Sequence, residues 1–204
     1  MFTGLIREMA EVEAYRNNEL ILKADYKPGV GDSVAVNGAC LTVIRLLPQG
    51  FAVELSPETQ RYIATQNLQG KVHIEPAMAM GDRFEGHIVQ GHVDCIGEIS
   101  NIKDNGNSID FFISIPEEFR RFLVPKGSVT VDGVSLTINE VTKEGFRLTI
   151  IPHTLKESLF GVYTLGYQLN IETDMFARYI FHLFNPEKKQ SMSWEDIDKI
   201  SALY

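Results

Sequence analysis

The chain has little cysteine: its 204 residues include only Cys40 and Cys95, which lie far apart in the sequence and form no CxxC pair. Two distant thiols do not make a disulfide framework. Such a low count is typical of reduced thiols in a cytosolic compartment. The sequence also lacks a G-x-G-x-x-G dinucleotide fingerprint. We therefore expect no cofactor and no bound metal.

Positive charge is scarce too, since 19 Lys and Arg face 27 Asp and Glu, for a formal net charge of −8 at pH 7. Nucleic-acid binders cluster an excess of Lys and Arg against phosphate groups, so a small-molecule or protein partner is favoured. No apolar run approaches the roughly 20 residues that cross a bilayer. Residues 1–4 lead into patterned sequence without the features of a secretory signal. We expect a soluble, cytoplasmic protein that binds neither nucleic acid nor membranes.

An internal repeat organises what is present. Residues 33–43, Ser-Val-Ala-Val-Asn-Gly-Ala-Cys-Leu-Thr-Val, return 95 positions later as residues 128–138, Ser-Val-Thr-Val-Asp-Gly-Val-Ser-Leu-Thr-Ile. Further matching pairs extend the repeat with small shifts of offset: Gly4 and Gly91, Ile6 and Val93, Pro57 and Pro152, Thr59 and Thr154, and Glu75 and Glu172. The chain therefore consists of two copies of one unit followed by a tail.

Short β-branched and apolar runs alternate with turn signals in both copies, which is typical of an all-β sandwich or barrel. Turn residues such as Asn17-Asn18 and Asn105-Gly106 tolerate positive φ and separate these runs. We expect strands over residues 34–36, 41–47, 51–55, 95–103 and 109–115. With the remaining runs each copy has about six strands. Pro57 and Pro152 are predicted to open short helices, because proline is pre-set for the first helical turn.

The tail has a different pattern from the two copies. Its apolar residues are spaced as one face of an amphipathic helix: Phe176, Tyr179, Ile180, Leu183 and Phe184. Asn185-Pro186 would end this helix, and a second short helix is expected over residues 193–203. In the first copy the equivalent stretch, 80–90, instead links the two units. Because an exposed apolar stripe needs a partner, we expect the tail to serve assembly.

Small polar side chains recur at the same two positions of each copy. Cys40 and Thr42 stand two residues apart on one face of a predicted strand, and Ser135 and Thr137 repeat this geometry. The first copy alone would favour a small buried cysteine beside a glycine bend. The repetition favours two similar pockets, each lined by hydrogen-bonding side chains.

Residues 86–95 gather two imidazoles, a carboxylate and a thiol. If this segment is a strand, His92 and Asp94 point to one face while Cys95 points to the other, and His87 is separated from them by glycine. No second cluster supplies missing ligands, so a zinc site is disfavoured. His92 is better suited to carry a proton in a pocket, because imidazole titrates near neutral pH.

Two other features have both a structural and a functional interpretation. Thr173 or Asp174 can serve as the N-cap of the tail helix, or can contribute to a site where the preceding strand ends. The Pro-x-Thr segments at 57–59 and 152–154 can hold the polar edge of a ligand with free backbone N–H groups, or can be ordinary helix starts.

Six segments together resemble one known family. They are residues 1–4 (Met-Phe-Thr-Gly), 37–43 (Asn-Gly-Ala-Cys-Leu-Thr-Val), 86–94 (Gly-His-Ile-Val-Gln-Gly-His-Val-Asp), 131–137 (Val-Asp-Gly-Val-Ser-Leu-Thr), 151–155 (Ile-Pro-His-Thr-Leu) and 170–172 (Asn-Ile-Glu). In this order, and with the duplication included, the chain is similar to the α-chain type of riboflavin synthase, a lumazine-binding repeat family. Residues 185–204 lie outside the resemblance.

The resemblance implies an all-β fold of two tandem, pseudo-symmetric, six-stranded Greek-key β-barrels followed by a C-terminal α-helix. We expect an N-terminal lumazine-binding barrel over residues 1–86, a C-terminal lumazine-binding barrel over 87–175, and a helical tail for trimerisation over 176–204. It also implies a homotrimer, with each active site between the N-barrel of one subunit and the C-barrel of its neighbour.

The activity that the resemblance implies is the dismutation of two 6,7-dimethyl-8-ribityllumazine molecules per site. The products are riboflavin and 5-amino-6-(ribitylamino)pyrimidine-2,4-dione, formed by transfer of a four-carbon unit in the last step of riboflavin biosynthesis. Because electrons move only between substrate molecules, no cofactor is implied. Association with a lumazine synthase capsid is left open.

A non-catalytic lumazine- or flavin-binding paralogue is the alternative, since such proteins share the duplicated fold. They lose polar groups in one pocket, whereas this chain keeps all of the following: Cys40, Thr42, His92, Ser135, Thr137 and Asp174. The enzyme is therefore favoured. A scaffold that binds another protein through its tail would explain the helix but not the repeated polar pockets.

Site residues follow from the resemblance position by position, with no metal ligand among them. The functionally sensitive, catalytic positions are Phe2, Cys40, His92, Ser135 and Asp174. The implied substrate contacts of the N-barrel are Gly4, Leu5, Ile6, Cys40, Leu41, Thr42, Glu54, Leu55, Ser56, Pro57, Glu58 and Thr59. Those of the C-barrel are Gly91, His92, Val93, Lys126, Ser135, Leu136, Thr137, Ile150, Ile151, Pro152, His153, Thr154 and Leu155. Cys40 and His92 are thus expected in opposite halves of the composite site.

Overall fold

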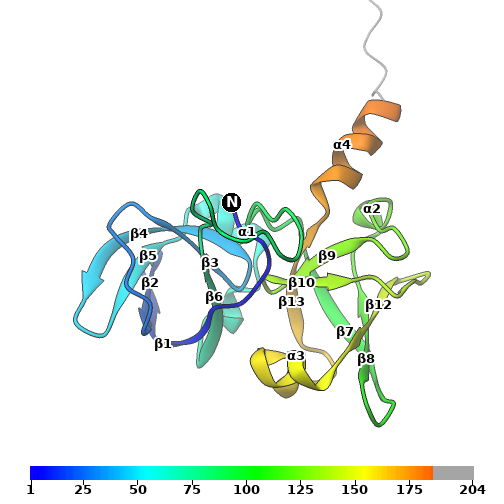
Figure 1. Ribbon diagram of the computed structural model, residues 1–204, viewed down its shortest axis with the longest axis horizontal. Helices are drawn as coiled ribbons and strands as arrows, with labels where there is room; N and C mark the ends of the chain where they lie inside the picture. Colours follow the sequence, from blue (N-terminus) through cyan, green and yellow to red (C-terminus); the bar gives the residue numbers. More distant parts are fainter. Residues whose placement is uncertain (186–204) are drawn as a thin grey trace, which may run out of the picture.

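Two curled β-sheets lie side by side in the computed structural model of the chain, and a helix leaves the second of them (Figure 1). The structure describes residues 1–185, so the helix expected over 193–203 lies outside the described residues. Among the helices of residues 1–185, none is long and apolar enough to span a membrane. The expected all-β class with a C-terminal helix is confirmed.

The first copy forms a closed antiparallel barrel. Its strands are β1 (Glu8–Arg16), β2 (Glu19–Lys23), β3 (Ser33–Val36), β4 (Ala39–Leu47), β5 (Gly50–Glu54) and β6 (Lys71–Pro76). They follow one another around the barrel in the order β1-β2-β5-β4-β3-β6, which includes the crossed connection of a Greek key. Between β5 and β6 lie α1 (Pro57–Tyr62) and a 3₁₀ turn (Thr65–Asn67), so the helix start predicted at Pro57 is confirmed.

The second copy forms a curled sheet of seven strands rather than a closed barrel of six. Its strands are β7 (Cys95–Asp104), β8 (Ile109–Ser114), β9 (Ser128–Val131), β10 (Val134–Thr137), β11 (Glu140–Val141), β12 (Gly145–Ile150) and β13 (Gln168–Thr173). They run in the order β10-β9-β13-β7-β8-β12-β11. The helical segments are α2 (Glu117–Arg120), α3 (Pro152–Glu157), a 3₁₀ turn (Leu159–Val162) and α4 (Met175–Phe184).

The extra strand arises because β10 and β11 together correspond to the single strand β4. At the equivalent place β4 shifts register between Val43 and Arg45. In the second copy the backbone N–H of Asn139 donates to the carbonyl of Arg147 at 3.0 Å, and its Oδ1 accepts the N–H of Thr149 at 2.7 Å. The side chain of Asn139 thus accepts the N–H of Thr149, which a backbone carbonyl would accept in a continuous strand. The second copy therefore has a break between β10 and β11 where β4 has only a bulge.

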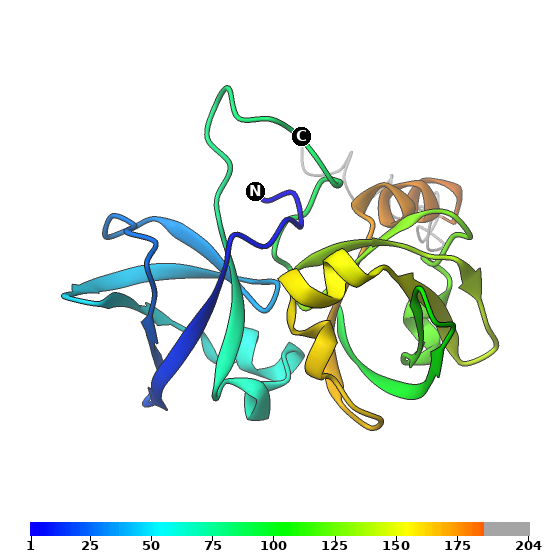
Figure 2. The same ribbon diagram turned by 60° about the horizontal axis from the view of Figure 1, so that its bottom comes forward.

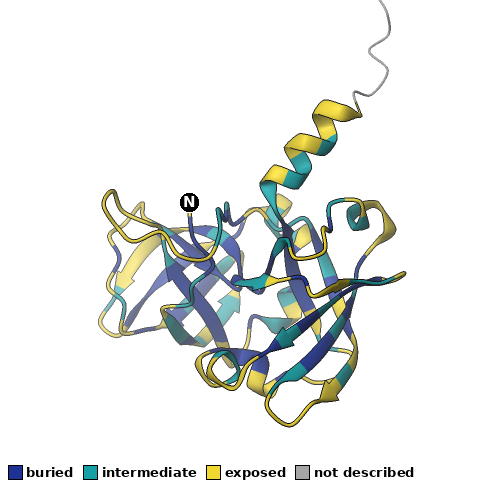
Figure 3. Cartoon of the chain, turned by 45° about the vertical axis from the view of Figure 1, so that its right-hand side comes forward, coloured by how far each residue is buried: buried dark blue, intermediate teal, exposed yellow. Residues whose placement is uncertain are grey.

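Each sheet buries its own hydrophobic core, and the inward face of both sheets is buried in Figure 3. The first core includes Leu20, Leu22, Phe51, Val53, Val72 and Ile74, all of which are fully buried. The second includes Ile99, Phe111, Ile113, Phe146, Leu148 and Ile171. The chain therefore forms two small hydrophobic cores rather than one large core, as the repeat predicts.

A pseudo-two-fold relation joins the copies. Phe2 and Val89, which occupy equivalent positions ahead of the two units, form an antiparallel bridge with N–H to carbonyl distances of 2.8 and 3.1 Å. Figure 2 shows the N-terminal segment, in dark blue, and the linker, in green, on the same side of the molecule. Each copy therefore begins at the boundary between the two sheets.

His73 bridges the copies from within this boundary. Its Nδ1 donates to the carbonyl of Asp132 at 2.8 Å, because its Nε2 accepts the N–H of Leu159 at 2.7 Å and so carries no proton. Burial lowers the pKa of His73 to about 4, and the hydrogen bond to Asp132 opposes this effect. The ring is therefore neutral at pH 7.

Asn170 makes the equivalent bridge in the opposite direction. Its Nδ2 donates to the carbonyl of Asn37 at 2.8 Å, and its Oδ1 accepts the N–H of Ala64 at 2.7 Å. An amide and a neutral imidazole each offer one donor and one acceptor, so different side chains satisfy the same pair of groups.

Helix α4 projects away from the second sheet (Figures 1 and 3). The side chain of Asp174 caps it by accepting the N–H of Phe176 at 2.9 Å, so the capping interpretation holds for Asp174. The predicted apolar stripe is confirmed and lies exposed, with Leu183 at 73% and Phe184 at 81% exposure. Nothing within residues 1–185 covers this stripe.

The neutral His73 predicts an acid-sensitive contribution to stability. Because the folded-state pKa of about 4 lies below the ordinary 6.5, the unfolded chain takes up more protons between these values. The contribution is complete above pH 6.5 and is lost as the pH falls through 4. The unfolding free energy of the wild type exceeds that of the His73→Asn variant by an amount that depends on pH. This excess should be about 3 kcal/mol smaller at pH 4 than at pH 7.

Urea unfolding at a series of pH values measures this difference, and other titrating groups cancel because both proteins contain them. Asn170→Ala is the matched control, because it breaks the equivalent bridge without removing a titrating group. The decrease in unfolding free energy caused by Asn170→Ala should not vary with pH. A cost of His73→Asn that is equally constant would contradict the prediction.

Candidate active site

Two equivalent turns bring the polar strands β4 and β10 to the boundary between the copies. Asn37-Gly38 and Asp132-Gly133 have positive φ angles of 43°, 81°, 45° and 83°, the backbone of a two-residue hairpin turn. A Cβ on Gly38 would lie 2.7 Å from the nitrogen of Gly133, and one on Gly133 would lie 2.9 Å from the nitrogen of Gly38. Only glycine at both positions lets the turns touch.

A short leading segment precedes each copy: residues 3–6 precede the first copy and residues 90–93 precede the second. Each leading segment lies against a polar strand of the other copy, β10 or β4. The N–H of Ser135 donates to the carbonyl of Gly4 at 2.7 Å, and the N–H of Cys40 donates to the carbonyl of Gly91 at 2.8 Å. The adjoining side chains follow, since Ile6 packs into the second core and residue 93 into the first. The two copies therefore exchange their leading segments.

This exchange corrects the grouping made from the sequence. The resemblance implies that residues 4–6 serve the first barrel and 91–93 the second, but within one chain residues 4–6 lie against Ser135 and residues 91–93 against Cys40. His92 follows Gly91 and therefore lies on the side of Cys40, so placing these two in opposite halves is wrong. The repeat made the segments equivalent without indicating which barrel receives them.

A pocket of about 210 Å³ lies beside Ser135. Both copies line it, with Gly4, Leu5, Ile6, Val134, Ser135, Leu136, His153, Thr154, Glu157 and Ser158. The start of α3 faces this pocket, and Ile151 at its N-cap makes no side-chain cap. The strand, the leading segment and the helix start predicted for substrate contact thus come together here.

The equivalent residues meet beside Cys40. Cys40 is half-buried and Thr42 is exposed, while Gly91 adjoins them through its hydrogen bond. At the start of α1 the side chain of Ser56 accepts the N–H of Thr59 at 3.0 Å, unlike the uncapped start of α3. The two sites therefore combine equivalent elements and differ in how a helix start presents its N–H groups.

Several predicted contact residues have restricted access. Leu55 and Ile150 occupy equivalent positions, and both side chains are buried in the barrel cores. Leu41 is buried in the same way, so these three can offer only backbone groups to a ligand. Exposed side chains belong to Thr42, Glu54, Ser56, Pro57, Glu58, His92, Lys126, Thr137, Ile151, Pro152 and His153.

Ser135 has an imidazole partner. Its hydroxyl lies 2.7 Å from Nδ1 of His87, and Nε2 of His87 lies 3.3 Å from the hydroxyl of Thr130. Burial lowers the pKa of His87, while the charge of Asp174 raises it. A neutral imidazole beside a hydroxyl can take up its proton, which suits a general base or an activated nucleophile.

The remaining sensitive residues lie around the leading segments. Phe2 is fully buried and packs with Ala35, Val89 and Cys40, so it fixes the bridge between the copies. His92 is exposed, with its backbone N–H donated to a carboxylate oxygen of Glu172 at 3.1 Å. Thus Phe2, Cys40 and His92 lie together at the site on β4, and Ser135 lies at the pocket on β10.

The candidate metal ligands are engaged elsewhere. Cys95 begins strand β7 and is buried in the second core, where burial raises the pKa of its thiol to about 12. Asp94 pairs with Arg178 at 2.8 Å and accepts the N–H of Thr173 at 2.7 Å. Residues 91–94 precede the strand, so the alternation of faces assumed for them does not apply. Within residues 1–185 no group of three or more potential ligands is arranged around a metal position.

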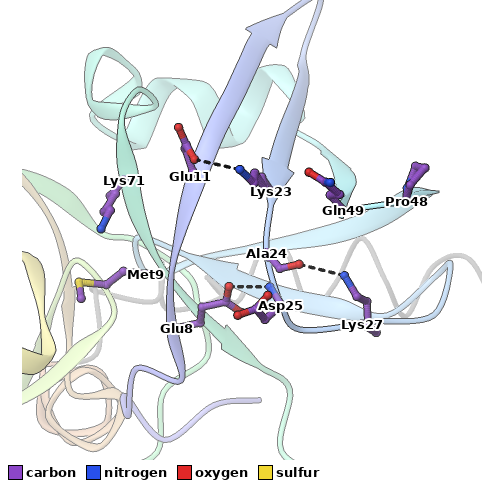
Figure 4. Close-up of a pocket in the computed structure, with 10 residues that line it drawn as sticks. All are labelled: Glu8, Met9, Glu11, Lys23, Ala24, Asp25, Lys27, Pro48, Gln49 and Lys71. Carbon is purple, nitrogen blue, oxygen red and sulfur yellow. Dashed lines mark hydrogen bonds and ion pairs between the residues drawn. The ribbon is translucent and has the colours of Figure 1, made fainter.

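A larger pocket of about 520 Å³ lies outside the first barrel and contains no predicted site residue (Figure 4). Several of its charged groups have local partners: Lys23 pairs with Glu11 at 3.8 Å, and Glu8 accepts the N–H of Asp25 at 2.7 Å. Lys27 donates to the carbonyl of Ala24 at 3.0 Å. No observation connects this pocket with the paired sites.

Two acidic residues at the site were not identified from the sequence. Glu75 and Glu172 are buried, and each accepts several hydrogen bonds from a leading segment. The repeated Ile-Glu pair was visible in the sequence, but a strand-end carboxylate carries no local signal of its partners. His87 was considered only as a metal ligand, because its contact with Ser135 spans 48 residues.

Comparisons with known proteins agree with the duplicated architecture. A family model described as "Lumazine binding domain" matches residues 3–77 and 90–174. The riboflavin synthase of Photobacterium phosphoreum is 41% identical over 206 residues, which covers 94% of this chain and 94% of that protein. The riboflavin synthase of Bacillus subtilis (strain 168) is 38% identical over 202 residues, covering 93% and 94%.

Solved structures of LumP share the fold. LumP complexed with riboflavin gives a TM-score of 0.76 at 17% identity, covering 85% of this chain and 100% of that chain. LumP complexed with 6,7-dimethyl-8-(1'-D-ribityl) lumazine gives 0.73 at 18% identity, covering 85% and 99%. At these identities the likeness concerns the fold alone.

Close packing at Gly91 predicts a costly substitution. A Cβ there would lie 2.6 Å from Cβ of Cys40, and the φ angle is +78°. Gly91→Ala should combine left-handed strain of about 1 kcal/mol with overpacking of about 1–3 kcal/mol, as measured by urea unfolding. Gly106→Ala is the matched control, because Gly106 has φ +84° and open space around it. Equal costs for the two variants would show that the leading segment does not press on Cys40.

Proposed function

The chain belongs to the riboflavin synthase family, and from that membership we propose that it catalyses the dismutation of two 6,7-dimethyl-8-ribityllumazine molecules. The products are riboflavin and 5-amino-6-(ribitylamino)pyrimidine-2,4-dione. A four-carbon unit leaves one lumazine and joins the other, so the enzyme is a transferase and completes riboflavin biosynthesis in the cytoplasm. No cofactor takes part, because electrons move only between the two substrate molecules.

The observation that carries this proposal is the equivalent placement of two polar strands at the boundary between the copies. Cys40 and Ser135 stand at the same place in the two copies, each beside the leading segment of the other copy. Two related pockets suit a reaction between two copies of one ligand, because binding both in fixed orientations removes much of the entropic barrier to their reaction.

We divide the proposed substrate contacts between two pockets, and the exchange of segments supports this division. One pocket combines residues 40–42, 91–93 and the start of α1, and the other combines 135–137, 4–6 and the start of α3. Lys126, next to the interrupted strand, contributes from the edge of the second pocket. The proposed domains are residues 1–86, 87–175 and 176–204, with the tail used for assembly.

The reaction needs removal of a proton from the C7 methyl group of one lumazine and addition of a nucleophile at C7 of the other. His87 and Ser135 are suited to proton transfer at the second pocket, since their side chains lie 2.7 Å apart. Cys40 and His92 offer a thiol and an imidazole at the first. Asp174 assists through its charge near His87.

The proposed active enzyme is a homotrimer. The exposed stripe of α4 is the surface that requires a partner, and a closed ring of three subunits would cover it. Each active site then joins the Cys40 pocket of one subunit with the Ser135 pocket of its neighbour. The second candidate is a binding protein without catalytic activity, because LumP, which shares this fold, is complexed with riboflavin and with 6,7-dimethyl-8-(1'-D-ribityl) lumazine in its solved structures. Activity distinguishes the two candidates.

The direct test is to incubate the purified, chelator-dialysed protein with 6,7-dimethyl-8-ribityllumazine alone. We expect riboflavin to form, with two lumazine molecules consumed for each riboflavin, at a rate unchanged by the chelator. Tight binding of lumazine without any riboflavin would favour the non-catalytic protein, and activity that returns only with added zinc would overturn the cofactor-free mechanism.

Composite sites predict complementation between two damaged chains. Cys40→Ala and Ser135→Ala should each weaken the homotrimer, because every site then has one damaged pocket. In randomly mixed trimers about a quarter of the interfaces unite two undamaged pockets, so co-refolded mixtures should exceed both parents in riboflavin formation.

The matched control pairs Cys40→Ala with His92→Ala, which damage the same pocket and should not complement. Native mass spectrometry confirms that mixed trimers have formed. If the Cys40→Ala and Ser135→Ala mixture stays at the mean of its parents, the active site lies within one chain.

A further inference from the structure

A buried carboxylate holds the first leading segment in place. Glu75 lies on β6 and is 4% exposed. Its two oxygens accept the N–H of Thr3 at 2.8 Å and the N–H of Gly4 at 3.0 Å, and the hydroxyl of Thr3 donates to it at 2.9 Å. Hydrogen bonds to a carboxylate are among the stronger ones in proteins, so this end of the chain is firmly fixed.

Glu172 on β13 holds the second leading segment in the same way and is 3% exposed. It accepts the N–H groups of Gln90 at 2.8 Å, Gly91 at 2.8 Å and His92 at 3.1 Å. Arg178 on α4 lies 4.0 Å from the carboxylate and donates to the side chain of Gln90 at 2.9 Å. The two glutamates occupy equivalent positions of the repeat.

Each of these contacts continues to the opposite barrel through a single glycine. Gly4 gives its N–H to Glu75 and accepts the N–H of Ser135 with its carbonyl at 2.7 Å. Gly91 gives its N–H to Glu172 and accepts the N–H of Cys40 at 2.8 Å. A carboxylate on one sheet is thereby joined to the pocket strand of the other by two consecutive hydrogen bonds.

We propose that Glu75 and Glu172 are positioning residues that act crosswise. Glu75, on the first barrel, sets the geometry of the Ser135 pocket, and Glu172, on the second sheet, sets that of the Cys40 pocket. This inference rests on the proposed function only in treating Cys40 and Ser135 as pocket residues.

The number of acceptor oxygens explains why glutamate stands at both positions. A carboxylate accepts hydrogen bonds on both oxygens, whereas an amide of the same shape would turn its NH₂ group toward an N–H donor. Burial raises the pKa of Glu172 to about 7, and the N–H donors and Arg178 oppose this effect. Glu→Gln therefore keeps the side-chain volume and breaks the hydrogen bonds that one of the two oxygens accepts.

Cysteine alkylation reports each pocket separately. Cys40 is half-buried, whereas Cys95 is buried and its thiol pKa is raised to about 12, so iodoacetamide will react at Cys40. The double substitution Cys40→Ser and Ser135→Cys moves the reactive thiol to the equivalent place in the other pocket. We call this double variant the thiol-moved background. Glu75→Gln and Glu172→Gln are each introduced into the wild type and into the thiol-moved background, and mass spectrometry measures the alkylation rates.

Glu172→Gln should change the alkylation rate of Cys40 by about fivefold or more, and Glu75→Gln should change it by less than about twofold, because only one of the two glutamates is joined to each pocket. In the thiol-moved background the two effects should exchange. An effect on the same-side pocket, equal effects on both pockets, or no effect on either would overturn the proposal. A merely structural role would lower the melting temperature and change both pockets alike.

Milder substitutions keep the test decisive if a Glu→Gln variant does not fold. Thr3→Val removes one hydrogen bond to Glu75, and Arg178→Gln removes the cation near Glu172 and its contact with Gln90. The same crossed pattern is expected, with smaller changes. Alkylation requires no turnover, so a protein that makes no riboflavin yet shows the crossed pattern would refute the proposed function while supporting this inference.

Discussion

The exchange of leading segments between the two copies is the constraint on which the rest of the structure depends. Gly4 and Gly91 pass so close to Ser135 and Cys40 that a Cβ would lie 2.5 and 2.6 Å from the Cβ atoms of those residues. Ile6 then completes the second core, and its counterpart at residue 93 completes the first. Neither barrel has its full core without the other, so pocket walls, cores and the relative placement of the copies are settled together.

On this symmetric frame the chemistry is unequal. Cys40 presents a thiol, whereas Ser135 presents a hydroxyl with an imidazole 2.7 Å away. One pocket adjoins a helix start capped by Ser56, and the other adjoins a start without a side-chain cap. A reaction in which two identical molecules play opposite parts needs this combination: similar shapes bind the same ligand, and different groups assign it different roles.

The features that the sequence predicts are local ones. The spacing of Phe176 to Phe184 identifies the stripe of α4, and the pairs Asn17-Asn18 and Asn105-Gly106 identify turns between consecutive strands. The crossing was not predictable in this way, because residues 4–6 and 91–93 show the same apolar pattern whichever barrel they join. The misplacement of His92 has this cause. The interruption between β10 and β11 depends on one side chain, because Oδ1 of Asn139 accepts the hydrogen bond from the N–H of Thr149.

Buried polar groups make the boundary between the copies specific. His73 and Asn170 each bridge the copies with a donor and an acceptor, and within residues 1–185 no buried side-chain polar atom lacks a partner. Apolar surfaces alone tolerate sliding, whereas a buried hydrogen bond is costly to break and so fixes one register. Because each pocket combines residues from both copies, a small slip would separate Gly4 from Ser135 and Gly91 from Cys40 together. The polar boundary thus stabilises the geometry of both pockets, although neither His73 nor Asn170 belongs to either one.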